Sequence, residues 1–389
     1  MAGSLGGGSR ASHGSIDSLP ISPYYPSMII YEPKLKTNMR DYGIMLPMSP
    51  SRLEKTLDYL KQKHSALPVY NFAEIRSKFG ITEPFNRADL ERVHDKDYIA
   101  RLYNEGPDAN ALEKEMLSAY ELVNSDGTYN RYEPEKATKP LSDQAKKLFL
   151  RCEGSYLACR AALALLPAGH GRSLKNFCFY FGGGSHHARY EKSSGFCILN
   201  DVILAARKIL AEGYAGLVWI IDVDAHKGDG SAELIQRARD KGELFTGKAP
   251  EILSLSVHMA KGWPLDAESL AAAEPGHAPL VPSDIDIPVD SGEEAFYVDR
   301  LREGVAKLEA LSGGRKPDLV IVVDGVDVYE YDGLPSTSVL KLTLEQCLSR
   351  DRFLFSYMQE HGLPSAWFNA GGYGERAWEP TAHFLEGLS

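Results

Sequence analysis

A short stretch near the middle of the chain combines residue types that can do chemistry. An apolar run ending at Ile221 leads into Asp222, Asp224, His226 and Asp229. The apolar run predicts a buried strand, and the polar residues predict a loop at its end. Because Asp224 and His226 are two positions apart, both can point to one spot, and such a pair suits Zn²⁺ or a similar divalent ion. A turn rich in aspartate is the alternative.

Other apolar segments also end in polar residues. Strands are predicted at residues 176–181, 216–222, 252–257, 318–324 and 366–369. The first is followed by His186 and His187, the third by His258, the fourth by Asp327 and the fifth by Tyr373. Helices are predicted at residues 145–166, 201–212, 231–241, 293–312 and 344–361. This alternation predicts an α/β fold with a central parallel sheet and helices on both faces. The carboxyl ends of parallel strands open on one side, so the polar residues are expected to meet there.

Together these residues could form a metal-dependent hydrolytic site. Asp224, His226 and Asp327 would supply three ligands and leave positions open for water and a substrate carbonyl. A metal ion at this site would polarise the carbonyl and lower the pKa of the water. His186 or His187 could then take the proton of the water.

Three further residues could complete this chemistry. Asp222 and Asp229 are available to orient the two imidazoles and set their basicity. Tyr373, within Gly-Gly-Tyr-Gly, could donate its hydroxyl to an oxyanion. The residue types therefore point to hydrolysis of an amide or ester carbonyl, although each of them also fits an ordinary turn or cap.

The earlier part of the chain is less regular. A strand is expected at residues 28–31, a helix at 51–62 and a helical region at 88–102. The polar residues 104–143 are expected to form a functional surface loop. A second long loop is expected further along the chain, at residues 261–283. No linker or internal repeat is evident, so we expect one domain at residues 28–389. Residues 1–27 include a Gly/Ser-rich run that is typical of a flexible leader or tag, with Met28 as a native start.

Composition narrows the functional classes. The formal net charge of −10 over 389 residues argues against direct nucleic-acid binding, and no apolar run reaches the roughly 18–20 residues that span a bilayer. The five cysteines are odd in number and widely spaced, which favours a reducing compartment such as the cytoplasm. A nuclear or host-targeted location and a homo-oligomeric state are equally compatible with the sequence.

Four motifs resemble the zinc-dependent histone deacetylase family, which includes bacterial deacetylase-like amidohydrolases and acetylpolyamine amidohydrolases. They are Gly-Gly-Ser-His-His-Ala (183–188), Ser-Gly-Phe-Cys-Ile-Leu-Asn-Asp (194–201), Asp-Val-Asp-Ala-His-Lys-Gly-Asp-Gly (222–230) and Gly-Tyr (372–373). The resemblance runs from about Met28 to the C-terminus. It implies the arginase/deacetylase fold, a single α/β domain.

The resemblance also implies a role for each site residue. Asp224, His226 and Asp327 would bind one zinc ion. His187 would be the general base, and His186 its partner. Family members also hold a structural monovalent cation, usually K⁺, which would lie on Asp222, Ser256 and the main chain of Asp224, His226 and Val257.

The resemblance also implies which residues support the two histidines and which bind the substrate. Asp222 would support His186, Asp229 would support His187, and Tyr373 would bind the carbonyl oxygen and the oxyanion. The implied substrate-binding residues are Gly195 and Phe196 in the acyl-lysine tunnel, Trp263 or Pro264 opposite them, Leu334 nearby, and Arg52 of Pro50-Ser51-Arg52 near the acetate exit.

Three features depart from the family pattern. Lys227 stands where many members have a histidine that is not a ligand. The rim around residues 138–140 has no aspartate where the eukaryotic enzymes hold the substrate backbone. Residues 326–332 are closer to the bacterial and polyamine-type members.

These features leave several functions open. The first is removal of acetyl or related acyl groups from the lysine side chains of a protein or peptide. The second is hydrolysis of acetylated polyamines by the same mechanism. An arginase-like ureohydrolase is a third, although Asp324 and Asp327 are three apart rather than forming its Asp-x-Asp. A scaffold that binds acylated partners without turnover is the fourth.

Overall fold

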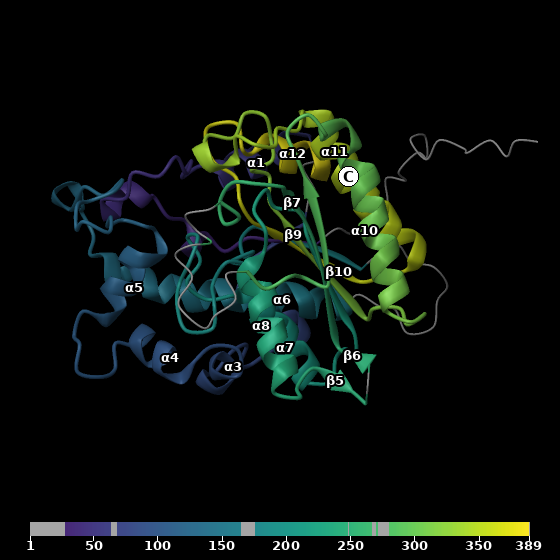
Figure 1. Cartoon of the computed structure of the whole chain (residues 1–389), viewed down its shortest axis with the longest axis horizontal. Helices are drawn as coiled ribbons and strands as arrows, with labels where there is room; N and C mark the ends of the chain where they lie inside the picture. The colour runs from purple at the N-terminus through teal and green to yellow at the C-terminus, as the bar shows by residue number, and fades with distance from the viewer. Residues whose placement is uncertain are drawn as a thin grey trace, which may run out of the picture.

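The computed structural model describes residues 28–63, 68–164, 176–247, 249–266, 270 and 280–388. The predicted leader at residues 1–27 and much of the predicted loop at 261–283 lie outside these ranges. Within them, the strands of the main sheet are all parallel, which confirms the predicted fold class (Figure 1). Their order is β2-β1-β3-β10-β9-β4-β7-β8.

The strands of the sheet are short and mostly buried. They are β1 (Met28–Ile30), β2 (Val69–Tyr70), β3 (Phe177–Tyr180), β4 (Val218–Asp222), β7 (Ile252–Met259), β8 (Ile285–Val289), β9 (Leu319–Asp324) and β10 (Ser365–Asn369). Every residue of β3, β4, β7, β9 and β10 is buried. The reason is that helices cover both faces, so most of these strands are nearly continuous apolar runs, although β7 also buries Ser254, Ser256 and His258.

Alternate residues of each central strand serve two separate cores. Ile220 and Phe368 pack with α6 (Ala145–Ala164), α7 (Asp201–Ala211) and α8 (Asp229–Asp240) on one face. Trp219 and Trp367 pack on the other face with α1 (Arg52–Lys63), α10 (Tyr297–Leu311), α11 (Leu344–His361) and α12 (Glu379–Glu386). Figure 1 shows these two helical layers on either side of the sheet.

Several elements were not predicted from the sequence. The predicted loop at residues 104–143 contains a helix, α5 (Ala111–Ala119), whose buried Leu112, Met116 and Ala119 recur at helical spacing among polar residues. The predicted helical region at 88–102 is two helices, α3 (Arg87–Glu91) and α4 (Lys96–Leu102), because Asp95 caps the second. Also unpredicted are β2, β8, α2 (Phe72–Phe79), α12 and a small antiparallel pair, β5 (Phe245–Thr246) with β6 (Ala249–Pro250).

Short 3₁₀ turns connect these elements. They lie at Pro33–Leu35, Met39–Tyr42, Pro134–Lys136, Leu141–Gln144, Glu294–Phe296 and Pro335–Thr337. No helix in the described ranges is both long enough and apolar enough to span a bilayer. All five cysteines are buried and unpaired.

Candidate active site

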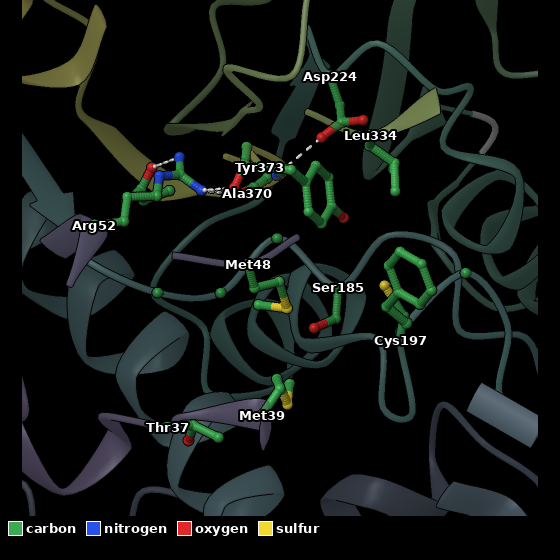
Figure 2. Close-up of a pocket in the computed structure, with 18 of the residues that line it drawn as sticks. Thr37, Met39, Met48, Arg52, Ser185, Cys197, Asp224, Leu334, Ala370 and Tyr373 are labelled. Atoms are coloured by element: carbon green, nitrogen blue, oxygen red, sulfur yellow. Dashed lines mark hydrogen bonds between the residues drawn. The ribbon is translucent and has the colours of Figure 1, made fainter. Parts of the chain in front are cut away.

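The carboxyl ends of the central strands open into a cavity of about 460 Å³. Figure 2 shows Tyr373 and Asp224 on its walls, together with residues from distant parts of the chain. The predicted site residues that line it are Arg52, His186, His187, Gly195, Phe196, Asp224, His226, Trp263, Leu334 and Tyr373. Asp222, Asp229 and Asp327 are buried behind this wall, and Trp263 rather than the buried Pro264 faces the cavity.

Asp224, His226 and Asp327 form a buried cluster whose ligand atoms lie within 4.8 Å of one another. The Nδ1 atom of His226 lies 3.2 Å from Asp224 Oδ1 and 3.0 Å from Asp327 Oδ2. Asp327 Oδ2 is nevertheless buried without a hydrogen-bond partner. Nε2 of the same histidine lies 3.1 Å from the Ser336 hydroxyl, so Nδ1 is the nitrogen that faces the carboxylates. Two carboxylates and one imidazole around an unsatisfied oxygen fit a divalent ion of the zinc type.

Main-chain amides hold these carboxylates in place. Asp224 accepts hydrogen bonds from the His226 amide and the Gly371 amide, both at 3.0 Å, while the Ala225 amide donates to Asp327 at 2.9 Å. A Cβ atom at Gly371 would lie 2.5 Å from Asp224 Oδ2, so this position tolerates only glycine. The cluster is therefore fixed by the loops after β4, β9 and β10.

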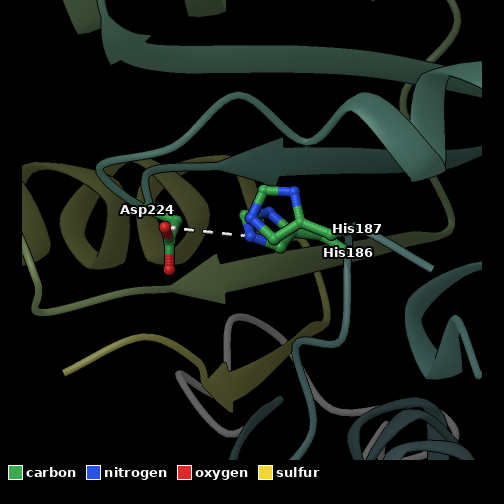
Figure 3. A group of neighbouring side chains, drawn as sticks. All are labelled: His186, His187 and Asp224. Carbon is green, nitrogen blue, oxygen red and sulfur yellow. Dashed lines mark ion pairs between the residues drawn. The ribbon is translucent and has the colours of Figure 1, made fainter. Parts of the chain in front are cut away.

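Two histidines, each paired with an aspartate, lie beside the cluster. His186 Nδ1 is 2.5 Å from Asp222 Oδ2, and His187 Nδ1 is 2.7 Å from Asp229 Oδ1. The two imidazole centroids are 3.9 Å apart, and all four side chains are buried. His186 Nε2 lies 3.8 Å from Asp224 Oδ1, so the pairs face the cluster (Figure 3). Carboxylates on Nδ1 leave the Nε2 atoms free for proton transfer.

The two imidazoles have opposite pKa shifts. Burial lowers the pKa of both, but for His186 the nearby carboxylates of Asp222 and Asp224 outweigh it and raise the pKa to about 9. For His187, burial and the neighbouring His186 together lower the pKa to about 4. One imidazole therefore carries a proton at neutral pH while the other is free to accept one, which separates acid from base.

Tyr373 is positioned by an aspartate that the sequence did not single out. Asp332 accepts hydrogen bonds from the Tyr373 amide at 2.7 Å, the Leu334 amide at 2.9 Å and the Thr337 hydroxyl at 3.0 Å. Burial raises the pKa of Tyr373 well above its usual value, so its hydroxyl keeps the proton that it would donate. The only sequence signal for Asp332 was its place at the end of the segment 326–332.

Two arginines bond to main-chain carbonyls around the site, Arg52 from a half-buried position and Arg350 from a fully buried one. Arg52 donates to the carbonyl oxygens of Ala370 and Gly372 at 3.0 and 3.2 Å, beside the cavity. Arg350 of α11 donates to those of Val223 and Gly325 at 3.0 and 2.8 Å, which lie in the two loops that carry the metal-ligand candidates. Arg350 was not predicted as a site residue from the sequence, although a charged residue on a buried helix face is a usable signal.

The residues predicted for a monovalent cation also come together. Asp222 of β4 and Ser256 of β7 are paired in register on neighbouring strands. The Ser256 hydroxyl is buried and has no hydrogen-bond partner. A carboxylate beside an unsatisfied hydroxyl fits a bound cation.

Two of the departures from the family pattern concern residues that do not line the cavity. Lys227 is buried against Asp286 and is not among the residues that line the cavity. The main chain of Thr138 and Lys139 donates to Asp41, and neither residue lines the cavity. Glu121 and Arg131, which the sequence analysis did not select, line it from the same segment of the chain.

A parallel sheet with an Asp-His-Asp cluster and two His–Asp pairs at its carboxyl edge is the arrangement of the arginase/deacetylase fold, a fold of metal-dependent hydrolases. The sequence model of the histone deacetylase domain matches residues 46–385. The chain therefore belongs to the histone deacetylase family.

Relatives of several kinds share this similarity. Histone deacetylase 2 of Arabidopsis thaliana is 25% identical over 79% of this chain and 67% of its own length. The acetoin utilization protein AcuC of Staphylococcus aureus is 27% identical over 70% of this chain and 69% of its own length. An uncharacterized protein of Picosynechococcus sp. is 32% identical, but that match spans only 49% of this chain and 54% of the relative.

A solved structure supports the fold. The acetylpolyamine aminohydrolase of Burkholderia pseudomallei superposes with a TM-score of 0.59 at 18% identity, covering 93% of this chain and 98% of that chain. At this identity the likeness establishes the fold only.

Proposed function

We propose that residues 28–389 form a zinc-dependent amidohydrolase that removes acetyl, or a related acyl group, from lysine side chains of proteins or peptides. The observation that carries this proposal is the pair of buried His–Asp couples facing an Asp-His-Asp cluster at the floor of the cavity. The substrate side chain would enter between Phe196 and Trp263, which both line the cavity. The buried, unpaired thiols favour a reducing compartment such as the cytoplasm.

The proposed enzyme would bind two cations, a catalytic Zn²⁺ and a structural K⁺. Zn²⁺ held by Asp224, His226 and Asp327 would polarise the scissile carbonyl and lower the pKa of water. A structural K⁺ would be held by Asp222, Ser256 and the main chain of Asp224, His226 and Val257. The unsatisfied oxygens of Asp327 and Ser256 support these two assignments.

His187 is the proposed general base. Asp229 holds its Nδ1 atom, and Arg189 holds the other oxygen of that carboxylate, so Nε2 is the free nitrogen. With its lowered pKa the imidazole is neutral at pH 7 and takes a proton from the attacking water. The Tyr373 hydroxyl donates a hydrogen bond to the carbonyl oxygen as negative charge develops there.

A protonated histidine of the pair completes the reaction. His186, with its raised pKa, carries a proton at neutral pH. Proton transfer to the amine nitrogen lets the carbon–nitrogen bond of the tetrahedral intermediate break, which releases lysine and a carboxylate. Arg52, on the wall of the cavity, is suited to attract that carboxylate on its way out.

Hydrolysis of acetylated polyamines is the second candidate. The fold neighbour from Burkholderia pseudomallei is an acetylpolyamine aminohydrolase, and the aromatic walls at Phe196 and Trp263 suit any methylene chain. Turnover of an acetyl-lysine peptide and of acetylputrescine by the zinc-loaded protein separates the two. A content near two divalent metal ions per chain, instead of one, would favour a ureohydrolase.

The roles are tested with His187→Ala and Tyr373→Phe. Each change should lower kcat by about 10²–10⁴-fold, the usual contribution of a proton-transfer or oxyanion group, while zinc stays bound. The measurements are turnover of an acetyl-lysine peptide and zinc content by elemental analysis. The matched control is His361→Ala, since the His361 side chain bonds to the Tyr357 carbonyl at the end of α11 and does not line the cavity. Full activity in either variant would contradict the assigned roles.

A further inference from the structure

One side of the cavity mouth carries a charge pair on a strained backbone. Glu121, Arg131 and Phe196 all have positive φ angles, of 52°, 50° and 66°, although none is glycine. All three line the cavity. Such backbone strain persists where the surrounding structure imposes it, and it gathers at functional sites. The three residues therefore form a built feature of the mouth.

The main chain around Arg131 is held on both sides. Its carbonyl accepts a hydrogen bond from the Met45 amide at 2.8 Å, and the neighbouring Asn130 amide donates to the Leu122 carbonyl at 2.9 Å. The Phe196 amide in turn donates to the Ala119 carbonyl at 2.8 Å. These bonds fix the backbone at Arg131 and at Phe196, from which the two side chains reach the cavity.

The guanidinium lies at the solvent edge of the tunnel. Its carbon is 5.9 Å from the centroid of the Phe196 ring, and that ring is 6.1 Å from the ring of Tyr373. The Arg131 side chain is 32% exposed. Nη2 donates to Glu121 at 3.2 Å, whereas Nε is shielded from solvent and has no hydrogen-bond partner in the described part of the chain. A guanidinium has five N–H donors, so this ion pair leaves further donors of Arg131 for a substrate oxygen.

No carboxylate that lines the cavity is left to bind an ammonium group, within the residues that the structure describes. Asp224 belongs to the metal-ligand cluster, Glu54 pairs with Lys36 at 3.0 Å, and Glu121 pairs with Arg131. A diamine that carries its acetyl group to the floor would therefore bring its free ammonium toward a guanidinium. A lysine residue would bring main-chain carbonyl oxygens, which accept hydrogen bonds from it.

We infer that Arg131 is a specificity-determining residue that binds a main-chain carbonyl of an acyl-lysine peptide and disfavours acylated polyamines. This inference rests on the proposed amidohydrolase function and decides between its two substrate classes. The guanidinium acts as a hydrogen-bond donor to the substrate backbone.

The test uses two substrates that place the same four methylenes next to the acetylated nitrogen. One is Nα,Nε-diacetyl-lysine methylamide, which is neutral and offers main-chain carbonyls, and the other is N-acetylcadaverine, which ends in an ammonium. The zinc-loaded wild-type protein should have the higher kcat/KM on the lysine substrate. Arg131→Met should lower that value about tenfold or more, the loss expected for a charge-assisted hydrogen bond, and leave or raise the value for N-acetylcadaverine.

Two further variants sharpen the result. Arg131→Lys should retain part of the activity on the lysine substrate, because it keeps the charge without the planar fork. Arg352→Met removes an arginine that pairs on the surface with Glu345 and should change neither value. Equal loss on both substrates in Arg131→Met, no loss on either, or loss on N-acetylcadaverine alone would overturn the inference. A zinc-loaded wild-type protein that hydrolyses neither substrate would instead refute the proposed function.

Discussion

The floor and the rim of the cavity are built in different ways. The floor consists of His186, His187, Asp224 and His226, which line the cavity, and of Asp327, which is buried beneath them. All five lie at the ends of buried strands and are at most 5% exposed. The rim, formed by Glu121, Arg131, Phe196, Trp263 and Leu334, comes from loops. Floor side chains are held by main-chain amides and carboxylates. The rim backbone at Arg131 and Phe196 is hydrogen-bonded, but the rim side chains are held by ring contacts and one partly exposed ion pair.

This difference separates reaction from selection. Groups fixed by a sheet keep the geometry that proton transfer needs, to within a few tenths of an ångström. Loop residues can vary without disturbing that geometry, and so they suit the choice of substrate. We therefore expect changes at the floor to affect kcat strongly and changes at the rim to affect mainly KM or substrate choice.

The largest effect is expected at the floor, from Asp327→Asn. The amide lacks the charge that a divalent ion needs, so zinc content and turnover should both fall to background. Elemental analysis and a peptide assay measure the two. Asp318→Asn is the matched control, because Asp318 precedes the same strand at its opposite end and accepts hydrogen bonds from the main-chain amides of Gly216 and Leu217. Retained zinc and activity in Asp327→Asn would place the metal site elsewhere.

An intermediate effect is expected one layer behind the floor, from Asp229→Asn. Loss of the carboxylate on His187 Nδ1 should lower kcat roughly 10–100-fold, as is usual for groups that orient a catalytic or ligating histidine. Steady-state kinetics with zinc-loaded protein measure it. Glu233→Gln serves for comparison, since Glu233 pairs with Arg189 as Asp229 does but not with His187. If the two variants lose activity equally, the loss is caused by the changed contacts of Arg189 and not by the missing support of the general base His187.

The smallest effect is expected at the rim, from Leu334→Ala. Removing part of an apolar wall weakens substrate and transition state alike, so KM should rise roughly two- to tenfold with kcat nearly unchanged. The comparison variant is Leu311→Ala, which trims a leucine that is 50% exposed at the end of α10. A drop in kcat as large as that of Asp229→Asn would erase the distinction between floor and rim.

The elements that sequence predicted best are those with a single strong pattern. The strands β4 and β9 are runs of apolar residues, and α11 matches its predicted residues 344–361. The edge strand β8 was missed because Asp286 and Pro288 interrupt it, and proline is tolerated there only because the strand lies at the edge of the sheet. Helix α5 was missed because its buried residues are few.

The site residues likewise fall into those that a local sequence pattern predicts and those that it does not. The histidine and aspartate motifs could be found in the sequence because each follows a strand, and parallel strands end on one side. The roles of Asp332 and Arg350 could not be found in this way, because they depend on the Tyr373 amide, 41 residues away, and on the Val223 carbonyl, 127 residues away. No local pattern records such a distance.

By itself, the sequence determined the fold class, the family resemblance and the residues at the floor, because these follow from periodicity and from motifs within short segments. Only the tertiary structure decided that Asp332 holds the Tyr373 amide, which nitrogen of His226 faces the cluster, and that Arg131 lies over Phe196. Those relations join segments far apart in the chain. They depend on how strands and loops pack, and packing is a property of the folded molecule as a whole.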